Sequence, residues 1–168
     1  MKKILITGAP GSGKTYLVNT FFSSLSNTVI QGILTVKEEN SIYLYKYTNH
    51  IIPGSRLLVG KCLENRPVPV SNLFDSKVVE YINDIISGTD IFFIDEIGII
   101  ENEQTKYINK IVEIWESNIN CIFVIKKKPS NFSARMFAAS KQQHLLIDLD
   151  IVTRNSAVRK ISEYYFAN

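Results

Sequence analysis

Residues 8–15, which read GAPGSGKT, constrain the fold of this chain more than any other segment. They match the pattern G-x-x-x-x-G-K-[ST] in the context that this pattern requires. The apolar residues 4–6 predict a short buried strand before the loop, and residues 14–25 show the periodicity of an amphipathic helix after it. A strand, a glycine-rich turn and a helix in this order predict a phosphate-binding loop (Walker A).

The residue types in the loop explain how it would hold a triphosphate. Glycines allow backbone conformations that a Cβ would forbid, so the N–H groups of residues 11–14 can converge on an anion. The positive end of the following helix points to the same place. We expect catalytic Lys14 to reach the β- and γ-phosphates and the Thr15 hydroxyl to bind Mg²⁺. The residues expected to contact ATP or GTP are Gly8, Ala9, Pro10, Gly11, Ser12, Gly13, Lys14, Thr15 and Tyr16.

A second motif consists of the apolar residues 91–94 followed by Asp95 and Glu96 (Walker B). The apolar run predicts a buried central strand, and its carboxyl end should lie near the phosphate loop. We expect Asp95 to hold Mg²⁺ through a water molecule and Glu96 to orient or deprotonate the attacking water. Without the loop, an apolar run ending in two acids would be equally typical of a simple turn.

Apolar strands alternate with amphipathic helices along the chain, which predicts an α/β fold in one domain over residues 1–168. Together with the phosphate loop, this pattern predicts a P-loop NTPase fold with a mainly parallel twisted sheet and helices on both faces. Residues 28–36 and 41–47 predict an antiparallel hairpin at one edge. Residues 51–70 contain several prolines and glycines and are expected to be mainly irregular, with a short strand at 56–59. Helices are expected at 72–87, 102–117, 131–140 and 154–166.

The chain resembles the THEP1 family of nucleoside-triphosphatases over most of its length. GAPGSGKT stands where that family has its Walker A loop, and residues 94–101, IDEIGIIE, are similar to its DEIG-x-x-E segment. Residues 32–35 and 59–61 look like further family positions. The resemblance implies a RecA-like fold and Mg²⁺-dependent hydrolysis of ATP, GTP and other triphosphates with a loose base preference. The matching catalytic positions are Lys14, Thr15, Asp95 and Glu96.

Two departures from the family concern positive charge near the nucleotide. The family motif Val-Thr-x-x-Asn-Arg is shortened at residues 152–156, so its arginine has no direct counterpart. The strand at 121–125 runs into three lysines, where the family has small and polar residues. Several cations therefore remain open as phosphate contacts: Arg56, Arg66, Lys126, Lys127, Lys128, Arg154 and Arg159.

Composition limits the partners. With 45% hydrophobic residues, a mean hydropathy near zero and a net charge of +3, the chain has a globular composition. It contains no run of 18 apolar residues, so we expect no membrane span and a cytoplasmic location. Without a basic helix carrying interleaved aromatics, nucleic acid is not an expected partner. Cys121 falls in an apolar run and is expected to be a buried thiol.

Two alternatives to hydrolysis stay open from the sequence. A P-loop kinase for small molecules or nucleotides would share the loop, although the chain's few scattered arginines do not resemble an arginine-rich lid. The shortened C-terminal motif is also compatible with a nucleotide-sensing module that hydrolyses weakly and responds to an unidentified protein partner.

Overall fold

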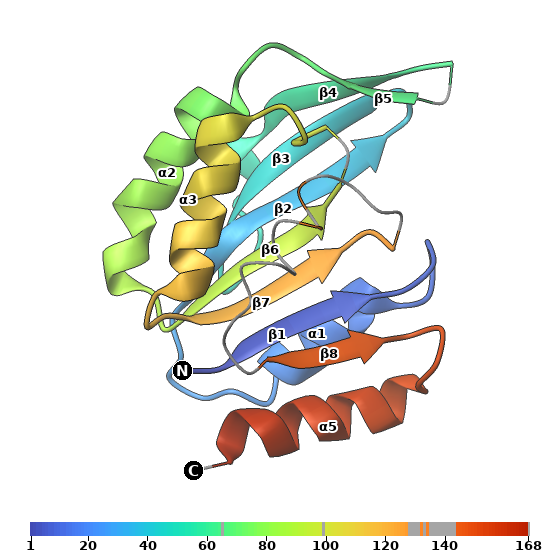
Figure 1. Cartoon of the computed structure of the whole chain (residues 1–168), viewed down its shortest axis with the longest axis vertical. Helices are drawn as coiled ribbons and strands as arrows, with labels where there is room; N and C mark the ends of the chain where they lie inside the picture. Colours follow the sequence, from blue (N-terminus) through green and yellow to red (C-terminus); the bar gives the residue numbers. More distant parts are fainter. Residues whose placement is uncertain (65, 99, 128–131, 133, 135–143, 168) are drawn as a thin grey trace.

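A single mixed sheet organises the protein (Figure 1). Within residues 1–64, 66–98, 100–127, 132, 134 and 144–167, which this computed structural model describes, eight strands run in the order β5-β4-β3-β2-β6-β7-β1-β8. The strands are β1 (Lys3–Thr7), β2 (Ile30–Glu38), β3 (Ser41–Thr48), β4 (Leu57–Leu63), β5 (Arg66–Pro69), β6 (Ile91–Ile97), β7 (Asn120–Ile125) and β8 (Leu145–Asp148). Strands β2, β6, β7, β1 and β8 are parallel, while β3, β4 and β5 continue the sheet antiparallel to their neighbours. The predicted fold class is confirmed.

Helices cover both faces of the parallel part, as expected. They are α1 (Lys14–Phe22), α2 (Val79–Ile85), α3 (Thr105–Glu116) and α5 (Arg154–Phe166). On one face, Phe92 of β6 belongs to a core cluster with residues of α2 and α3. On the other face, Phe93 packs edge-on against Phe22 of α1, with ring centroids 5.1 Å apart, and α5 joins the same cluster. Because both faces are buried, β6 and β7 are apolar along most of their length, without the alternation of a half-exposed strand.

The order of the strands fixes where the two motifs lie. The carboxyl ends of β1 and β6 meet the same edge of the sheet, on the right in Figure 1, so the loop after β1 and the acids that end β6 share one rim. Strand β7 lies between them and pairs in parallel with both. The residues that follow β7 therefore enter the same rim between the two motifs.

The short strand expected at 56–59 overlaps β4, but the prediction that residues 51–70 are mainly irregular was wrong, because β4 and β5 form a second hairpin there. Proline lacks an N–H and is usually avoided in strands, but an edge strand tolerates it because one side of its backbone has no partner. Pro67 and Pro69 lie in β5, the outermost strand at this end of the sheet. The antiparallel edge is therefore larger than the single hairpin expected.

The predicted helices differ in their details. The span 72–87 is divided into a π-helical turn (Phe74–Val78), α2 and a 3₁₀ turn (Ile86–Gly88). The final helix has the expected bounds. The helix expected at 131–140 falls mostly outside the described residues. Cys121 is fully buried and both cysteines are free thiols.

Strands β2 and β6 approach each other most closely at Gly32, which yields a test of the fold. A Cβ at this position would lie 1.8 Å from the carbonyl oxygen of Phe93, an impossible contact with rigid backbone. We predict that Gly32→Ala lowers the free energy of unfolding by about 3 kcal/mol or more, because the two strands must separate. Urea denaturation measures this change.

The control for this prediction is Gly88→Ala, because a Cβ at Gly88 would meet no atom within 4 Å. Its free energy of unfolding should stay within about 1 kcal/mol of the unsubstituted protein. Equal denaturation midpoints for Gly32→Ala and Gly88→Ala would contradict the proposed close approach of the strands.

Candidate functional site

The loop after β1 is shaped by glycines and closed by its own lysine. Gly11 and Gly13 have φ values of 77° and 97°, which L side chains rarely adopt, and Gly13 immediately precedes α1. The Ser12 N–H donates to the Ala9 carbonyl at 3.1 Å, which closes a turn. Lys14 is 9% exposed and folds back over the loop, where its ammonium donates to the carbonyls of Gly8 and Ala9, each at 3.0 Å. The ammonium thus already lies above the turn predicted to bind phosphate.

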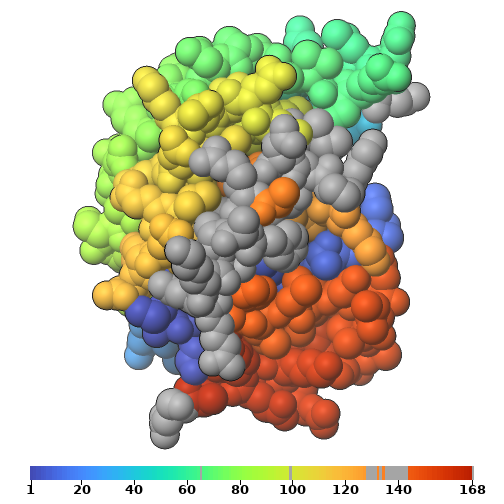
Figure 2. Space-filling model, in the orientation of Figure 1, coloured from blue at the N-terminus to red at the C-terminus, as the bar shows by residue number. Residues whose placement is uncertain are grey.

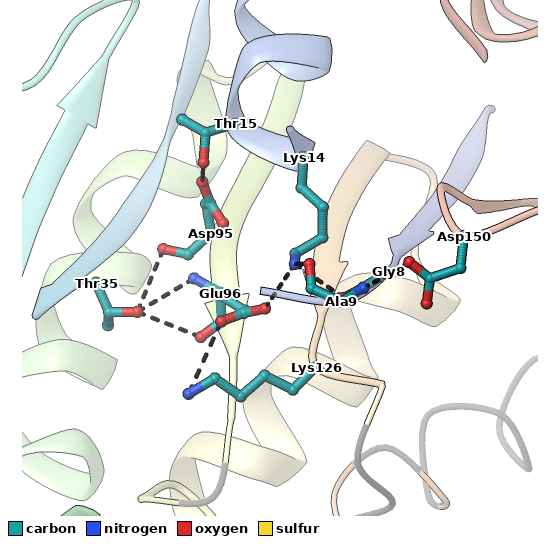
Figure 3. A network of polar contacts seen from close by, with 9 residues as sticks. All are labelled: Gly8, Ala9, Lys14, Thr15, Thr35, Asp95, Glu96, Lys126 and Asp150. Carbon is teal, nitrogen blue, oxygen red and sulfur yellow. Dashed lines mark hydrogen bonds and ion pairs between the residues drawn. The ribbon is translucent and has the colours of Figure 1, made fainter. Parts of the chain in front are cut away.

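The hydroxyl and the carboxylate expected to hold Mg²⁺ are in direct contact. Thr15 Oγ1, in the first turn of α1, donates to Asp95 Oδ2 at 2.8 Å (Figure 3). Asp95 is only 5% exposed. Burial raises its pKa to about 6, the hydrogen bond from Thr15 and the nearby Lys14 oppose this, and Glu96 adds to it. A buried carboxylate whose negative charge is only partly offset by neighbouring groups is a favourable ligand for a cation.

Glu96 lies between two lysines at the end of β6. Its Oε1 is 3.5 Å from the ammonium of Lys14, and its Oε2 is 3.8 Å from that of Lys126. Its backbone is fixed by β2, because the Glu96 N–H donates to Thr35 Oγ1 at 3.1 Å. Figure 3 shows the carboxylate directed between both cations. One carboxylate is therefore held beside the loop, with its two oxygens turned to different ammonium groups.

These side chains border one cleft of about 600 Å³. Its lining comprises Pro10, Gly11, Gly13, Lys14, Thr15, Leu34, Thr35, Val36, Lys37, Ile51, Asp95 and Glu96. The structure thus brings most of the predicted loop together with both predicted acids. In the part of the chain that is described, no group of three or more His, Cys, Asp or Glu side chains could hold a metal by itself.

A second set of contacts braces the loop from β8. The Ala9 N–H donates to Asp150 Oδ1 at 2.9 Å, and Lys127 contacts Asp150 at 2.8 Å and Asp148 at 3.2 Å. The bond from Ala9, followed by that from Lys127, lowers the pKa of Asp150. In Figure 2 the blue residues after β1 reach the surface between the orange residues after β7 and the red residues after β8. The neighbouring strands thus hold the loop from both sides.

The start of α5 also reaches the loop. A Cβ on Gly13 would lie 2.9 Å from Arg154 Cδ, so this arginine packs directly against the loop backbone. Its guanidinium carbon is 5.9 Å from the centre of the Tyr16 ring, and Tyr16 is 61% exposed. Tyr16, the last residue of the predicted contact set, is therefore exposed beside a cation next to the phosphate loop, and it is not among the residues that line the cleft.

The structure shows which of the lysines and arginines considered as phosphate contacts lie near the site and which lie elsewhere. Lys126 and Arg154 reach the site, whereas Lys127 is bound to Asp148 and Asp150. Arg159 pairs with Glu163 on the exposed side of α5. Arg56 pairs with Glu38 and lies over the Tyr43 ring, and Arg66 lies in the edge strand β5. Lys128 falls outside the described residues.

Sequence reasoning assigned no role to Thr35, Asp150 or Glu101. Thr35 stands near the carboxyl end of β2 and Asp150 just after β8, so the rule that ligands bind beyond the carboxyl ends of parallel strands could have indicated both. Glu101 is the last acid of the DEIG-x-x-E segment, but its location depends on a turn that spacing alone does not define.

Glu101 is a buried acid just behind the site. It is 2% exposed, and its Oε2 accepts a hydrogen bond from the Gly98 N–H at 3.1 Å. Burial raises the pKa of Glu101 from 4.5 to about 7, while the bond from Gly98 and the charge of Lys126 oppose the rise. Between about pH 4.5 and pH 7, the folded protein therefore retains a proton on Glu101 that the unfolded chain has already lost.

This raised pKa predicts how stability varies with pH. Since the folded state binds the extra proton, the stability of the unsubstituted protein should fall as pH rises from about 4.5 to about 7, by up to about 3 kcal/mol from this group. Glu101→Gln has no proton to lose and should show a flatter profile. Urea denaturation at about pH 5 and pH 8 measures the difference, and parallel pH profiles would refute the assignment.

Comparison with known proteins agrees with this geometry. Residues 3–162 match the model of a protein family described as NTPase. The nucleoside-triphosphatase THEP1 of Thermotoga sp. (strain RQ2) is 26% identical over 167 residues, covering 95% of this chain and 92% of the relative. That of Thermotoga maritima is 26% identical over 165 residues, with coverages of 95% and 92%.

A solved structure shows the same fold. The crystal structure of THEP1 from the hyperthermophile Aquifex aeolicus aligns with a TM-score of 0.69 at 19% identity, covering 95% of this chain and 96% of that chain. No helix among the described residues is long and apolar enough to cross a membrane. Because the family match extends over residues 3–162, almost the whole sequence, this chain belongs to the NTPase family of THEP1-type proteins.

Proposed function

We propose that this chain is a Mg²⁺-dependent enzyme that hydrolyses ATP, GTP and other nucleoside triphosphates to the diphosphate and phosphate, within one domain over residues 1–168. The observation that carries the proposal is the hydrogen bond from Thr15 to Asp95, with Lys14 and Glu96 beside it in one cleft. Hydrolysis of a triphosphate requires a metal site, a cation on the phosphates and a group that orients water. The cleft offers a residue for each role.

The donor set fits Mg²⁺. This ion prefers oxygen ligands and is usually bound by one or two protein groups together with substrate phosphates. Thr15 and Asp95 supply a hydroxyl and a carboxylate 2.8 Å apart, and burial of Asp95 raises its pKa in a way that a cation would offset. When bound, Mg²⁺ would neutralise charge on the phosphate oxygens.

The chain's own residues would divide the remaining work. The N–H groups of the loop bind the phosphates, while the Lys14 ammonium exchanges the carbonyls of Gly8 and Ala9 for phosphate oxygens. Glu96 orients a water molecule and accepts its proton as the water oxygen attacks the γ-phosphorus. The bond from this phosphorus to the bridging oxygen then breaks, so the products are a nucleoside diphosphate and inorganic phosphate.

A loose base preference is supported by an aromatic ring and a cation that lie next to the phosphate loop. Tyr16 is exposed and accompanied by Arg154. An aromatic ring and a guanidinium stack on the face of any base, whereas selection among bases requires hydrogen bonds to a base edge. Such a pair would bind ATP, GTP, CTP and UTP with similar strength.

A second candidate, phosphoryl transfer to a small molecule, has one observation in its favour. A cavity of about 450 Å³ adjoins the cleft and shares Thr15, Leu34 and Ile51 with it. Its lining includes the polar side chains of Asn19, Asn49 and His50. An acceptor bound there would approach the site from the side of α1, and a phosphorylated product formed faster than free phosphate would establish this function instead.

The hydrolysis proposal predicts the effect of Glu96→Gln. The amide keeps the shape of the carboxylate but cannot accept a proton, so kcat for phosphate release should fall by about a hundredfold or more. Binding of Mg²⁺-ATP should persist, because the loop, Lys14 and Thr15 are unchanged. Phosphate release from ATP, GTP, CTP and UTP without an added acceptor measures kcat, and calorimetry measures binding.

The matched control is Glu80→Gln, which removes an exposed carboxylate from α2, a helix that contributes no residue to the cleft lining. It should hydrolyse at the unsubstituted rate. If Glu96→Gln released phosphate as fast as this control, Glu96 would not be the group that activates water.

A further inference from the structure

Lys126 lies at the edge of the sheet that carries the phosphate loop, where a hydrogen bond fixes its backbone and its side chain is partly exposed. It directly follows β7, and its N–H donates to the carbonyl of Ile97 at 3.0 Å. Its ammonium lies 3.8 Å from Glu96 Oε2, yet the side chain is 45% exposed. An exposed ion pair of this kind contributes little on its own, so it does not by itself explain why the lysine lies here.

Two residues behind Lys126 restrict where its ammonium can lie. A Cβ on Gly98 would be 3.3 Å from Lys126 Nζ and 3.6 Å from Glu101 Oε2, so the glycine leaves room for the lysine beside the buried acid. Glu101 is fixed by the Gly98 N–H and lies close enough to Lys126 for the two charges to interact. The buried acid therefore attracts the ammonium from the interior side.

Charges alternate from the core to the phosphate loop. Glu101 and Lys126 both lie against Gly98, Lys126 pairs with Glu96, and Glu96 pairs with Lys14. Lys126 also lines a hollow of about 280 Å³ with Lys37, Thr35 and Glu96, and these last three residues line the main cleft too. Lys126 thus stands beside Glu96, on a different carboxylate oxygen from Lys14, in a hollow that shares three lining residues with the main cleft.

We propose that Lys126 is a catalytic residue that donates to an oxygen of the transferred phosphoryl group, and that buried Glu101 is the positioning residue that holds it there. The assignment rests on the hydrolytic function proposed above. Lys126 keeps its proton throughout and forms no covalent bond. Its ammonium stabilises negative charge on the phosphoryl oxygens opposite Lys14, which a cation supplied from elsewhere achieves in other phosphoryl-transfer proteins.

The first test separates catalysis from binding. Lys126→Ala should lower kcat by about a hundredfold while KM changes by less than about threefold, because the contact strengthens as charge develops in the transition state. Lys126→Arg should retain more activity than Lys126→Ala, since it keeps the charge. Lys61→Ala, which removes an exposed lysine of β4, is the control and should match the unsubstituted protein.

The second test asks whether Glu101 acts through Lys126. The assay is run at about pH 8, above the raised pKa of Glu101, so that this acid is ionised. There Glu101→Gln retains an acceptor for the Gly98 N–H but removes the negative charge, and should lower kcat by about tenfold. In the Lys126→Ala background the same substitution should have no further effect on kcat. An equal tenfold loss in both backgrounds would show that Glu101 acts independently and would overturn its positioning role.

A binding measurement keeps the proposal testable without turnover. Mg²⁺-ADP with tetrafluoroaluminate imitates the phosphoryl group in transfer, and the protein should bind it more tightly than Mg²⁺-ADP alone. Lys126→Ala should lose most of this extra affinity, whereas Lys61→Ala should keep it. Calorimetry measures both affinities, and an undiminished preference in Lys126→Ala would overturn the assignment.

The outcomes distinguish this inference from the proposed function. If the protein releases phosphate, Glu96→Gln does not, and Lys126→Ala is as active as Lys61→Ala, hydrolysis stands and the role of Lys126 is refuted. If no triphosphate yields phosphate, the hydrolytic function fails and the tetrafluoroaluminate measurement alone decides the role of Lys126.

Discussion

The hydrogen bond between Thr15 and Asp95 is the contact on which the site depends. It joins the first turn of α1 to β6, although β7 separates β6 from the strand that leads into α1. Because this contact bridges two non-adjacent strands, the phosphate loop, Thr15, Asp95 and Glu96 all border one cleft. The same arrangement leaves Asp95 buried with a single neutral donor, and burial raises its pKa to about 6. A cation at this point would both relieve the buried charge and attract a polyphosphate.

The residues around this contact form a continuous support. From β8, Asp150 binds the Ala9 N–H, and Arg154 at the start of α5 packs on Gly13. From β2, Thr35 fixes the backbone of Glu96. Each contact comes from the carboxyl end of a parallel strand or from the segment that follows it, which is why one rim can supply all of them. The antiparallel strands extend the sheet away from the loop and bring Cys62 of β4 to the hollow beside Glu96, which Lys37 of β2 also lines.

The sequence predicts the local parts of this site better than the distant ones. The phosphate loop and the Asp95–Glu96 pair are recognisable because strand, turn and chemistry are contiguous, and the alternation of apolar strands with amphipathic helices predicts the parallel sheet. Spacing does not reveal that β7 lies between the two motifs or that Asp150 reaches Ala9. Lys126 and Lys127 are identical in type, yet one faces Glu96 and the other Asp148 and Asp150, and their spacing after β7 does not predict which lysine takes which partner. Residues 51–70 were misjudged because their prolines suggested a loop, and only the position of β5 at an edge permits a strand there.

The most direct test is whether Mg²⁺ strengthens triphosphate binding through Asp95. Calorimetry with the non-hydrolysable β,γ-imido analogue of ATP, with Mg²⁺ and then with the metal chelated, measures this gain. We predict that the unsubstituted protein binds the analogue at least about tenfold more tightly with Mg²⁺, or about 1.4 kcal/mol. Asp95→Asn, which keeps an oxygen for Thr15 but loses the charge, should lose that gain. Equal affinities with and without Mg²⁺ in the unsubstituted protein, or an intact gain in Asp95→Asn, would contradict the account.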